Sequence, residues 1–176
     1  MHLQAWKASS FGQSIWQPPP IGFMKINFDV AINSYFSVTA AVLSNTSGDI
    51  ISAFTKKLLS TEVNKGESIA ALTGIDLAIL QGCNNLLIEG DSLVSILAIN
   101  NQNLFTEWSI APIIADIQLK LQHFQVWNAT KVSRSANFRA HHLAKWAATN
   151  LVFGSIPNSS SILSSIRINS GKDPPI

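Results

Sequence analysis

Charged side chains are scarce in this sequence. Asp, Glu, Lys and Arg together make up 12% of its 176 residues, compared with about 25% in typical soluble proteins. Hydrophobic residues make up 47%, so Ser, Thr, Asn and Gln must cover much of the surface. The length suits one domain with a sizeable core, because typical domains hold ~100–150 residues.

Cysteine is also scarce, and a membrane span and a secretory signal are lacking. The single Cys83 excludes an internal disulfide, which fits a reducing compartment, and it has no partner at zinc-ligand spacing. Polar residues or proline interrupt the uncharged runs 30–48 and 146–166, so neither is a membrane span. The N-terminus has no basic region followed by an apolar core. We therefore expect an intracellular protein, whose compartment and oligomeric state the sequence leaves open.

Hydrophobic periodicity predicts an ordered series of strands and helices. Residues 1–20, with three consecutive prolines, are interpreted as an approach segment, and the Ser-rich residues 154–176 as a disordered tail without a core. The order between them is β-β-β-α-β-α-α-β-α, which predicts an α/β domain with a mixed five-stranded sheet. The predicted strands are 23–31, 37–45, 50–58, 85–91 and 124–132, and the predicted helices are 62–81, 92–101, 108–123 and 137–153.

One carboxylate occupies the first strand at the point where burial should be greatest. Ile26 and Phe28 face one side of this strand, and Asn27 and Asp29 face the other, because strand side chains alternate. A charge buried alone costs several kcal/mol, roughly, so it needs an opposite charge, a proton or a metal. The position of Asp29 therefore indicates a functional or paired acid.

Two further acids are predicted to join Asp29. Asp91 ends the fourth strand, where an open α/β sheet forms a crevice, and Glu67 lies near the start of the first helix. Converging carboxylates cannot all ionise without a cation, and oxygen-only ligands favour a hard ion such as Mg²⁺. Separate ion pairs or surface exposure remain the alternatives. Glu89 is a fourth acid that does not fit an ordinary surface position.

Basic residues gather in a C-terminal stretch that contains no acid. They are Lys131, Arg134, Arg139 and Lys145. Such a cluster either meets phosphates or forms a solvated face. The net charge of +2 is only a weak indication of a nucleic-acid partner.

Four motifs in order resemble a known family. KINFDVA, GESIAAL, LLIEGDS and SRSANFRAHHLAKWA are similar to the ribonuclease H-like domain, in the plant version found in non-LTR retrotransposon reverse transcriptases and related free-standing genes. The resemblance covers residues 21–153 and implies a ribonuclease H-like fold with helices on both faces of the sheet. It also implies hydrolysis of the RNA strand of RNA–DNA hybrids with two Mg²⁺ or Mn²⁺ ions and no protein nucleophile.

The resemblance assigns catalytic roles to individual residues. Asp29 matches the acid that bridges both ions, and Glu67 and Asp91 match the acids that hold the ion on the leaving-group side. His141 stands where many relatives place a fourth carboxylate, and imidazole is a poorer Mg²⁺ ligand. His141 could bind an ion, act through water, or help move a proton. Simple packing at a helix start is its alternative, and that is the favoured interpretation for His142.

Substrate binding is expected from three further residues. Asn137 matches a family position that touches the nucleic-acid backbone, with a helix N-cap as an equal alternative. Ser92 caps the next helix or reaches substrate, and capping is favoured. Arg134 is assigned to substrate phosphates.

Two departures from the family pattern favour a different function. Val30 follows the first acid where relatives usually have Gly, and the second strand, VTAAVLSN, has Ala where relatives often have Gly. Both add side chains near the path of a hybrid. The alternative is a catalytically weak or inactive module of the same fold that binds nucleic acid or protein. A third interpretation, from the Trp- and Pro-rich beginning, is a terminal part of a longer reverse transcriptase.

Overall fold

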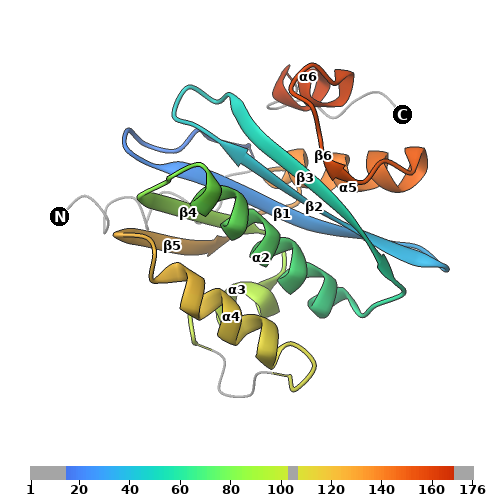
Figure 1. The fold of residues 1–176 in the computed structure, drawn as a ribbon, viewed down its shortest axis with the longest axis horizontal. Helices are drawn as coiled ribbons and strands as arrows, with labels where there is room; N and C mark the ends of the chain where they lie inside the picture. Colours follow the sequence, from blue (N-terminus) through green and yellow to red (C-terminus); the bar gives the residue numbers. More distant parts are fainter. Residues whose placement is uncertain (1–14, 103–106, 169–176) are drawn as a thin grey trace.

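A six-stranded mixed sheet forms the centre of the molecule. The computed structural model describes residues 15–102 and 107–168. The strands are β1 (Met24–Ile32), β2 (Phe36–Ser44), β3 (Ile50–Leu59), β4 (Asn85–Gly90), β5 (Val126–Lys131) and β6 (Gly154–Ser155). They lie in the order β5-β4-β1-β2-β3-β6 (Figure 1). β1, β2 and β3 form an antiparallel meander, and β1, β4 and β5 pair in parallel.

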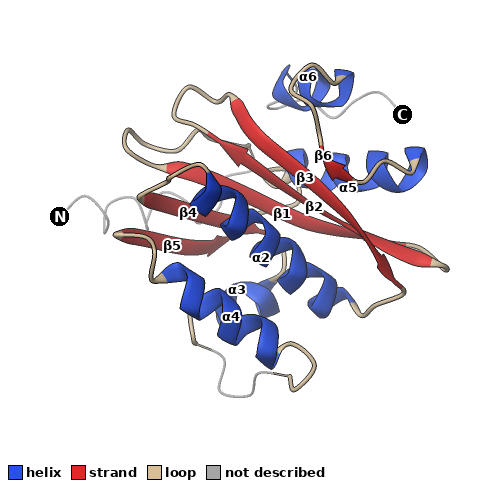
Figure 2. Ribbon diagram, in the orientation of Figure 1, coloured by secondary structure: helices blue, strands red, loops and turns tan. Residues whose placement is uncertain are grey.

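Helices cover both faces of this sheet, as Figure 2 shows. The helices are α2 (Val63–Leu80), α3 (Leu93–Ile99), α4 (Ala111–Leu121), α5 (Phe138–Asn150) and α6 (Ser161–Ile168). α2, α3 and α4 lie on one face, and α5 and α6 lie on the other (Figure 1). Pro112 falls at the start of α4, where a missing N–H is tolerated. The predicted order of elements is confirmed through α5.

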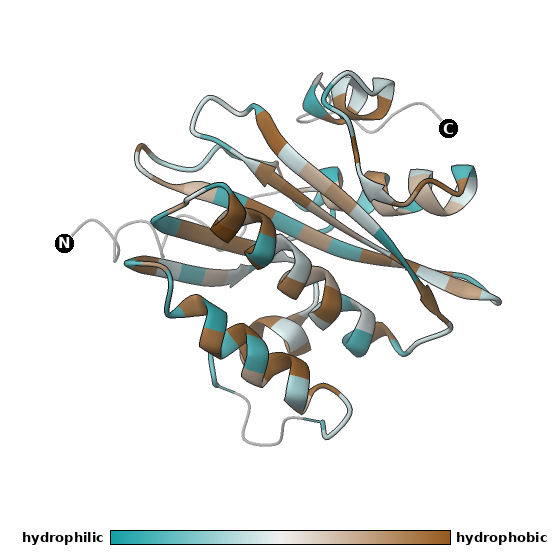
Figure 3. Ribbon diagram, in the orientation of Figure 1, coloured by the Kyte–Doolittle hydropathy of each residue, from teal (hydrophilic) through white to brown (hydrophobic). Residues whose placement is uncertain are grey.

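The alternation predicted for β1 divides the core into two parts. Ile26 and Phe28 are fully buried on the α2 side, in a cluster with residues of α2, α3, α4 and β4. A second cluster joins β2 and β3 to α5 and α6, and Val42, Leu143 and Leu163 belong to it. Figure 3 shows hydrophobic and hydrophilic residues alternating along the central strands and mixed along α4 and α6. The sheet is thus covered by apolar packing on both sides.

The expected coreless tail is wrong for residues 154–168. β6 pairs with β3 through Phe54↔Ser155 and Thr55↔Gly154. Three α6 side chains are buried against the sheet and α5; they are Ile162, Leu163 and Ile166. Apolar side chains at i, i+1 and i+4 fall on one face of a helix. The pattern is short and lies among serines, so it did not indicate a helix in the sequence. Residues 169–176 of the predicted tail lie outside the described part of the chain.

Among the described residues, β6 pairs with the edge of β3 over two residues, and the N–H of Ile156 donates to the carbonyl of Ala53 at 2.9 Å. Beyond the pairing with β6, β3 continues through the exposed Lys56 and Lys57 to Leu59. The Lys57 ammonium lies 4.8 Å from the ring centroid of Phe36. Directly after the pairing with β6, this edge strand therefore carries two charged side chains.

The approach segment also packs on the domain where the structure describes it. Trp16 is 6% exposed, its Nε1 donates to Asn27 Oδ1 at 2.9 Å, and the Arg139 guanidinium lies 3.6 Å from its ring centroid. Lys25 Nζ donates to the carbonyl of Gln17 at 2.7 Å. Residues 15–20 therefore belong to the folded unit, whereas residues 1–14 lie outside the described range.

Within residues 15–102 and 107–168, no helix combines the length and apolar character needed to cross a bilayer.

The packing of α6 generates a stability prediction. Leu163→Ala removes a fully buried side chain and should lower the free energy of unfolding by about 2–5 kcal/mol. Ser164→Ala, at the exposed neighbouring position, is the control and should change it by less than about 0.5 kcal/mol. Urea denaturation of both variants measures this. Equal stability of the two variants would show that α6 does not pack on the sheet in solution.

Candidate active site

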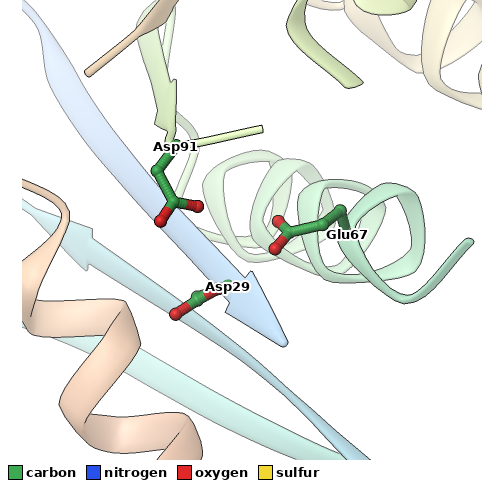
Figure 4. Close-up of side chains that lie close together, drawn as sticks. All are labelled: Asp29, Glu67 and Asp91. Atoms are coloured by element: carbon green, nitrogen blue, oxygen red, sulfur yellow. The ribbon is translucent and has the colours of Figure 1, made fainter. Parts of the chain in front are cut away.

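Three acidic side chains converge at one end of β1. β4 pairs with β1 in parallel up to Asn27↔Glu89, so the residue that follows β4, Asp91, comes next to Asp29. Glu67 reaches them from the first turns of α2 (Figure 4). One oxygen from each carboxylate lies within 4.8 Å of the others. The predicted convergence is therefore present in the structure.

Two glycines permit this close approach. A Cβ added to Gly90 would overlap the ring of Phe28, so a larger residue would push the end of β4 away from β1. A Cβ added to Gly66 would lie 2.8 Å from Val30 Cγ2. Gly66 therefore lets α2 approach β1 beside Glu67.

The acids repel one another, and Glu67 shows the effect most strongly. Its side chain is 3% exposed. Burial is the main cause that raises the pKa of Glu67, and the charge of Asp29, a hydrogen bond with Asp29 and the charge of Asp91 add to it, while a main-chain hydrogen bond from Val30 lowers it; together they bring this pKa to about 10. Without a cation, Glu67 therefore carries a proton at neutral pH.

The donor set fits a hard divalent cation. Glu67 Oε2 is buried and has no hydrogen-bond partner among the described residues. A carboxylate oxygen left unpaired in a buried site is costly unless a ligand satisfies it. Three converging carboxylates without a cysteine fit Mg²⁺ or Mn²⁺ better than zinc. Asp29, Glu67 and Asp91 are thus the residues that would hold such an ion.

His141 lies directly against the first of these acids. Its Nδ1 is 2.6 Å from Asp29 Oδ2, and the two side chains are 16% and 5% exposed. The other oxygen, Oδ1, accepts a hydrogen bond from the N–H of Val30 at 2.8 Å. Both oxygens of Asp29 are therefore oriented. His142, by contrast, packs its ring 4.4 Å from that of Phe138.

Arg134 and Ser92 lie beside the third acid. Arg134 Nε donates to Asp91 Oδ2 at 3.2 Å, and its side chain is 72% exposed. Ser92 Oγ accepts a hydrogen bond from the N–H of Ser95 and so caps α3. The capping interpretation of Ser92 is confirmed, and Arg134 presents a cation at the rim of the site.

Asn137 is fully buried rather than open to a ligand. Its Nδ2 donates to the carbonyl of Phe28 at 2.9 Å, and its Oδ1 accepts from Asn27 Nδ2 at 3.2 Å. The side chain makes no capping hydrogen bond at α5. Asn137 therefore connects the strand that carries Asp29 to the helix that carries His141, and a backbone contact with nucleic acid would have to break these bonds.

Two other charged residues assigned from the sequence are buried. Arg139 is 2% exposed, and its guanidinium donates to Ser44 Oγ and to the carbonyl of Gly48. It is therefore not part of an exposed basic cluster. Burial lowers the pKa of Arg139 to about 10, helped by the charge of Arg167. Glu89 pairs with Lys25 at 2.7 Å and accepts a hydrogen bond from Asn27 Nδ2 at 3.4 Å, so it has partners of its own outside the group of three acids.

An open groove of about 590 Å³ continues from the acids. Its lining is formed by Asp29, Val30, Ala31, Ile32, Asn33, Val63, Glu67, Arg134, His141, Lys145, Ala148 and Thr149. β4 ends before the last residues of β1, so this edge of β1 forms one wall of the groove. Most of these residues were not predicted as site residues. The helical spacing of His141, Lys145 and Thr149 could have indicated that they share one face of a helix.

The departures from the family pattern obstruct the groove less than expected. Val30 packs against the bare Cα of Gly66 while still lining the groove. Ala40 and Ala41 of VTAAVLSN are fully buried in the sheet. Their side chains therefore fill the core and do not stand in the path of a ligand.

Comparisons with known proteins identify the family. A family model described as reverse transcriptase-like matches residues 27–147, more than half of the chain. The chain therefore belongs to the reverse transcriptase-like family, and its domain is ribonuclease H-like. No curated protein matches the sequence.

Solved structures of low sequence identity share the fold. RNase H1 from the halophilic archaeon Halobacterium salinarum NRC-1 is 21% identical with a TM-score of 0.68, over 73% of this chain and 98% of that one. The N-terminal RNase H domain of rv2228c from Mycobacterium tuberculosis is 17% identical with a TM-score of 0.67, over 74% and 99%. LC11-RNase H1, in complex with an RNA/DNA hybrid, is 15% identical with a TM-score of 0.64, over 73% and 99%.

The proton on Glu67 generates a pH prediction. In chelator the folded protein holds a proton up to a pKa of about 10, compared with 4.5 for an ordinary glutamate, so this contribution to stability is complete below pH 4.5 and is lost as the pH rises toward 10. Relative to Glu67→Gln, wild-type unfolding free energy should therefore fall by up to about 1.4 kcal/mol per pH unit in this window. Urea denaturation at pH 6, 7 and 8 measures the slope.

The exposed Glu62→Gln variant is the control and should follow the wild-type slope. Parallel curves for wild type and Glu67→Gln would contradict a protonated Glu67.

Proposed function

We propose that this protein is a metal-dependent endoribonuclease that hydrolyses the RNA strand of RNA–DNA hybrids with two Mg²⁺ or Mn²⁺ ions. The observation that carries the proposal is the convergence of Asp29, Glu67 and Asp91 within 4.8 Å in a ribonuclease H-like fold. The likeness to LC11-RNase H1, solved with an RNA/DNA hybrid, supports this substrate class. A hybrid offers 2′-hydroxyls in a wide minor groove, by which a protein distinguishes its RNA strand.

The protein's contribution is to hold and orient the reacting groups. Bound divalent cations would stabilise the charge that develops on the phosphate and lower the pKa of a coordinated water. Asp29, Glu67 and Asp91 would hold them, and Glu67 must first release its proton, so cation binding is coupled to proton release. No side chain is needed as a nucleophile.

His141 and Arg134 complete the site from either side of the acids. His141 fixes Asp29 Oδ2 through its Nδ1 and lines the groove, where an imidazole can take part in proton transfer. If a second ion binds, Asp29 and His141 are its protein ligands. Arg134 orients Asp91 and exposes its guanidinium to a substrate phosphate.

A second candidate function is a binding module of the same fold that cuts slowly or not at all. The observation that favours it is an imidazole beside Asp29, where a carboxylate would hold Mg²⁺ more tightly. Hybrid binding in chelator, without product in Mg²⁺ or Mn²⁺ after long incubation, would establish this function instead.

Removal of the first acid tests the nuclease. Asp29→Asn takes away a metal ligand and should lower hybrid cleavage by more than about 100-fold in both Mg²⁺ and Mn²⁺, since even loss of a supporting residue costs 10–100-fold. Asp116→Asn, on the surface of α4 outside the groove, is the matched control and should keep wild-type activity. End-labelled RNA in a hybrid reports the cleavage. Equal rates for wild type and Asp29→Asn would refute the proposal.

A gain of activity tests the role of His141. His141→Asp supplies a fourth carboxylate next to Asp29 and should raise the cleavage rate several-fold in Mg²⁺. The gain should be smaller in Mn²⁺, which accepts imidazole more readily. Initial rates over a titration of each metal measure the effect. A lower rate in Mg²⁺ would mean that the imidazole itself is needed, for proton transfer.

A further inference from the structure

The groove extends beyond the acids along one face of α5. Lys145 follows His141 by four residues, which is about 6 Å along a helix axis, and Ala148 and Thr149 follow one turn later. All four line the groove. Their spacing places them on the same side of the helix. The groove therefore has an acidic end at the carboxylates and a second arm that runs past Lys145.

The opposite wall of this arm is mainly apolar. Ala31 and Ile32 belong to the edge of β1 that β4 does not reach, and Val63 stands at the start of α2. Asn33, which follows Ile32 in the lining, adds a polar group to this wall but no carboxylate. An apolar wall facing a single cation suits a ligand with a phosphate and an uncharged face, such as the sugar and base of a nucleotide.

Lys145 is the groove cation that is free to bind a ligand. Arg134 and Lys145 are the basic residues among the described residues of the lining, and Arg134 already pairs with Asp91. Lys145 is exposed, and no carboxylate in residues 15–102 or 107–168 forms an ion pair with its ammonium group. Lysine binds phosphate as a mobile point charge.

We propose that this arm is a subsite for the phosphate next to the scissile one in the same strand, with Lys145 as its ligand. The proposal rests on the proposed function, which places the scissile phosphate at Asp29, Glu67 and Asp91. Lys145 lies about 6 Å beyond His141 along the axis of α5, which is the scale of one nucleotide step. The apolar wall then faces the sugar between the two phosphates.

The salt dependence of binding tests the charge. Hybrid binding is measured by fluorescence anisotropy in chelator, with every variant built on Asp29→Asn so that no cleavage occurs. Lys145→Gln should weaken binding several-fold and reduce the slope of log K against log salt by about one unit, the loss of one phosphate contact. Lys145→Arg should restore most of the slope.

Lys65→Gln is the matched control. Lys65 is also an exposed lysine, on α2 between Val63 and Glu67, but it does not line the groove. Its removal should leave the slope unchanged. Equal slopes for Lys145→Gln and Lys65→Gln, or no detectable hybrid binding, would overturn the subsite.

Neutral phosphates locate the contact. A single uncharged methylphosphonate is placed at successive positions of the RNA strand of the hybrid. At one neighbour of the scissile phosphate, this replacement should weaken binding of the protein that keeps Lys145. It should not weaken binding of Lys145→Gln. Losses that simply add at every position would overturn the assignment. Failure of the nuclease proposal gives a different result from failure of the subsite. In that case the wild-type protein would not cleave the hybrid, but the coupling between Lys145 and one phosphate would persist.

Discussion

Repulsion among three carboxylates is the constraint on which the rest of the site depends. Their oxygens lie within 4.8 Å of one another, and the burial of Asp29 and Glu67 weakens the screening of their charges by water. Apolar packing of β1, β4 and α2 imposes this arrangement, and bare glycine backbone at positions 66 and 90 lets these elements approach. The fold therefore stores an unfavourable interaction that either a proton on Glu67 or a divalent cation relieves. A strained polar cluster of this kind is typical of a site preserved for function rather than for stability.

Much of this site could be predicted because its physics is local. The alternation of side chains around Asp29 predicts that its carboxylate points inward from the strand. Asp91 follows a run of apolar residues that is typical of a buried parallel strand, so its place at the end of that strand could also be predicted. The burial of Asn137 and Arg139 could not be predicted, because it depends on partners far away in the chain, such as Trp16 and Ser44. Sequence patterns report the face of an element, but not which remote side chain fills the space above it.

The packing of the C-terminal elements also could not be predicted from local sequence patterns. Among the described side chains of α6, three apolar ones are buried, and three serines stand among them, so a periodicity does not stand out in so short a helix. What makes α6 stable is the apolar surface that α5 and the sheet present to it, which exists only after the domain has folded. Similarly, the groove is a property of where β4 stops relative to β1. Such a register difference between strands has no signature in either strand alone.

The partly covered edge of β3 has a consequence for a chain with so few charges. An open strand edge offers unpaired N–H and C=O groups to a second copy of the same protein, and apolar, weakly charged sequences are the most prone to self-association by this route. Here β6 occupies two positions, and Lys56 and Lys57 follow immediately. Edge-to-edge pairing of two molecules would gather four ammonium groups in one small area. Lys56 and Lys57 thus place positive charge where it opposes edge-to-edge polymerisation of the sheet.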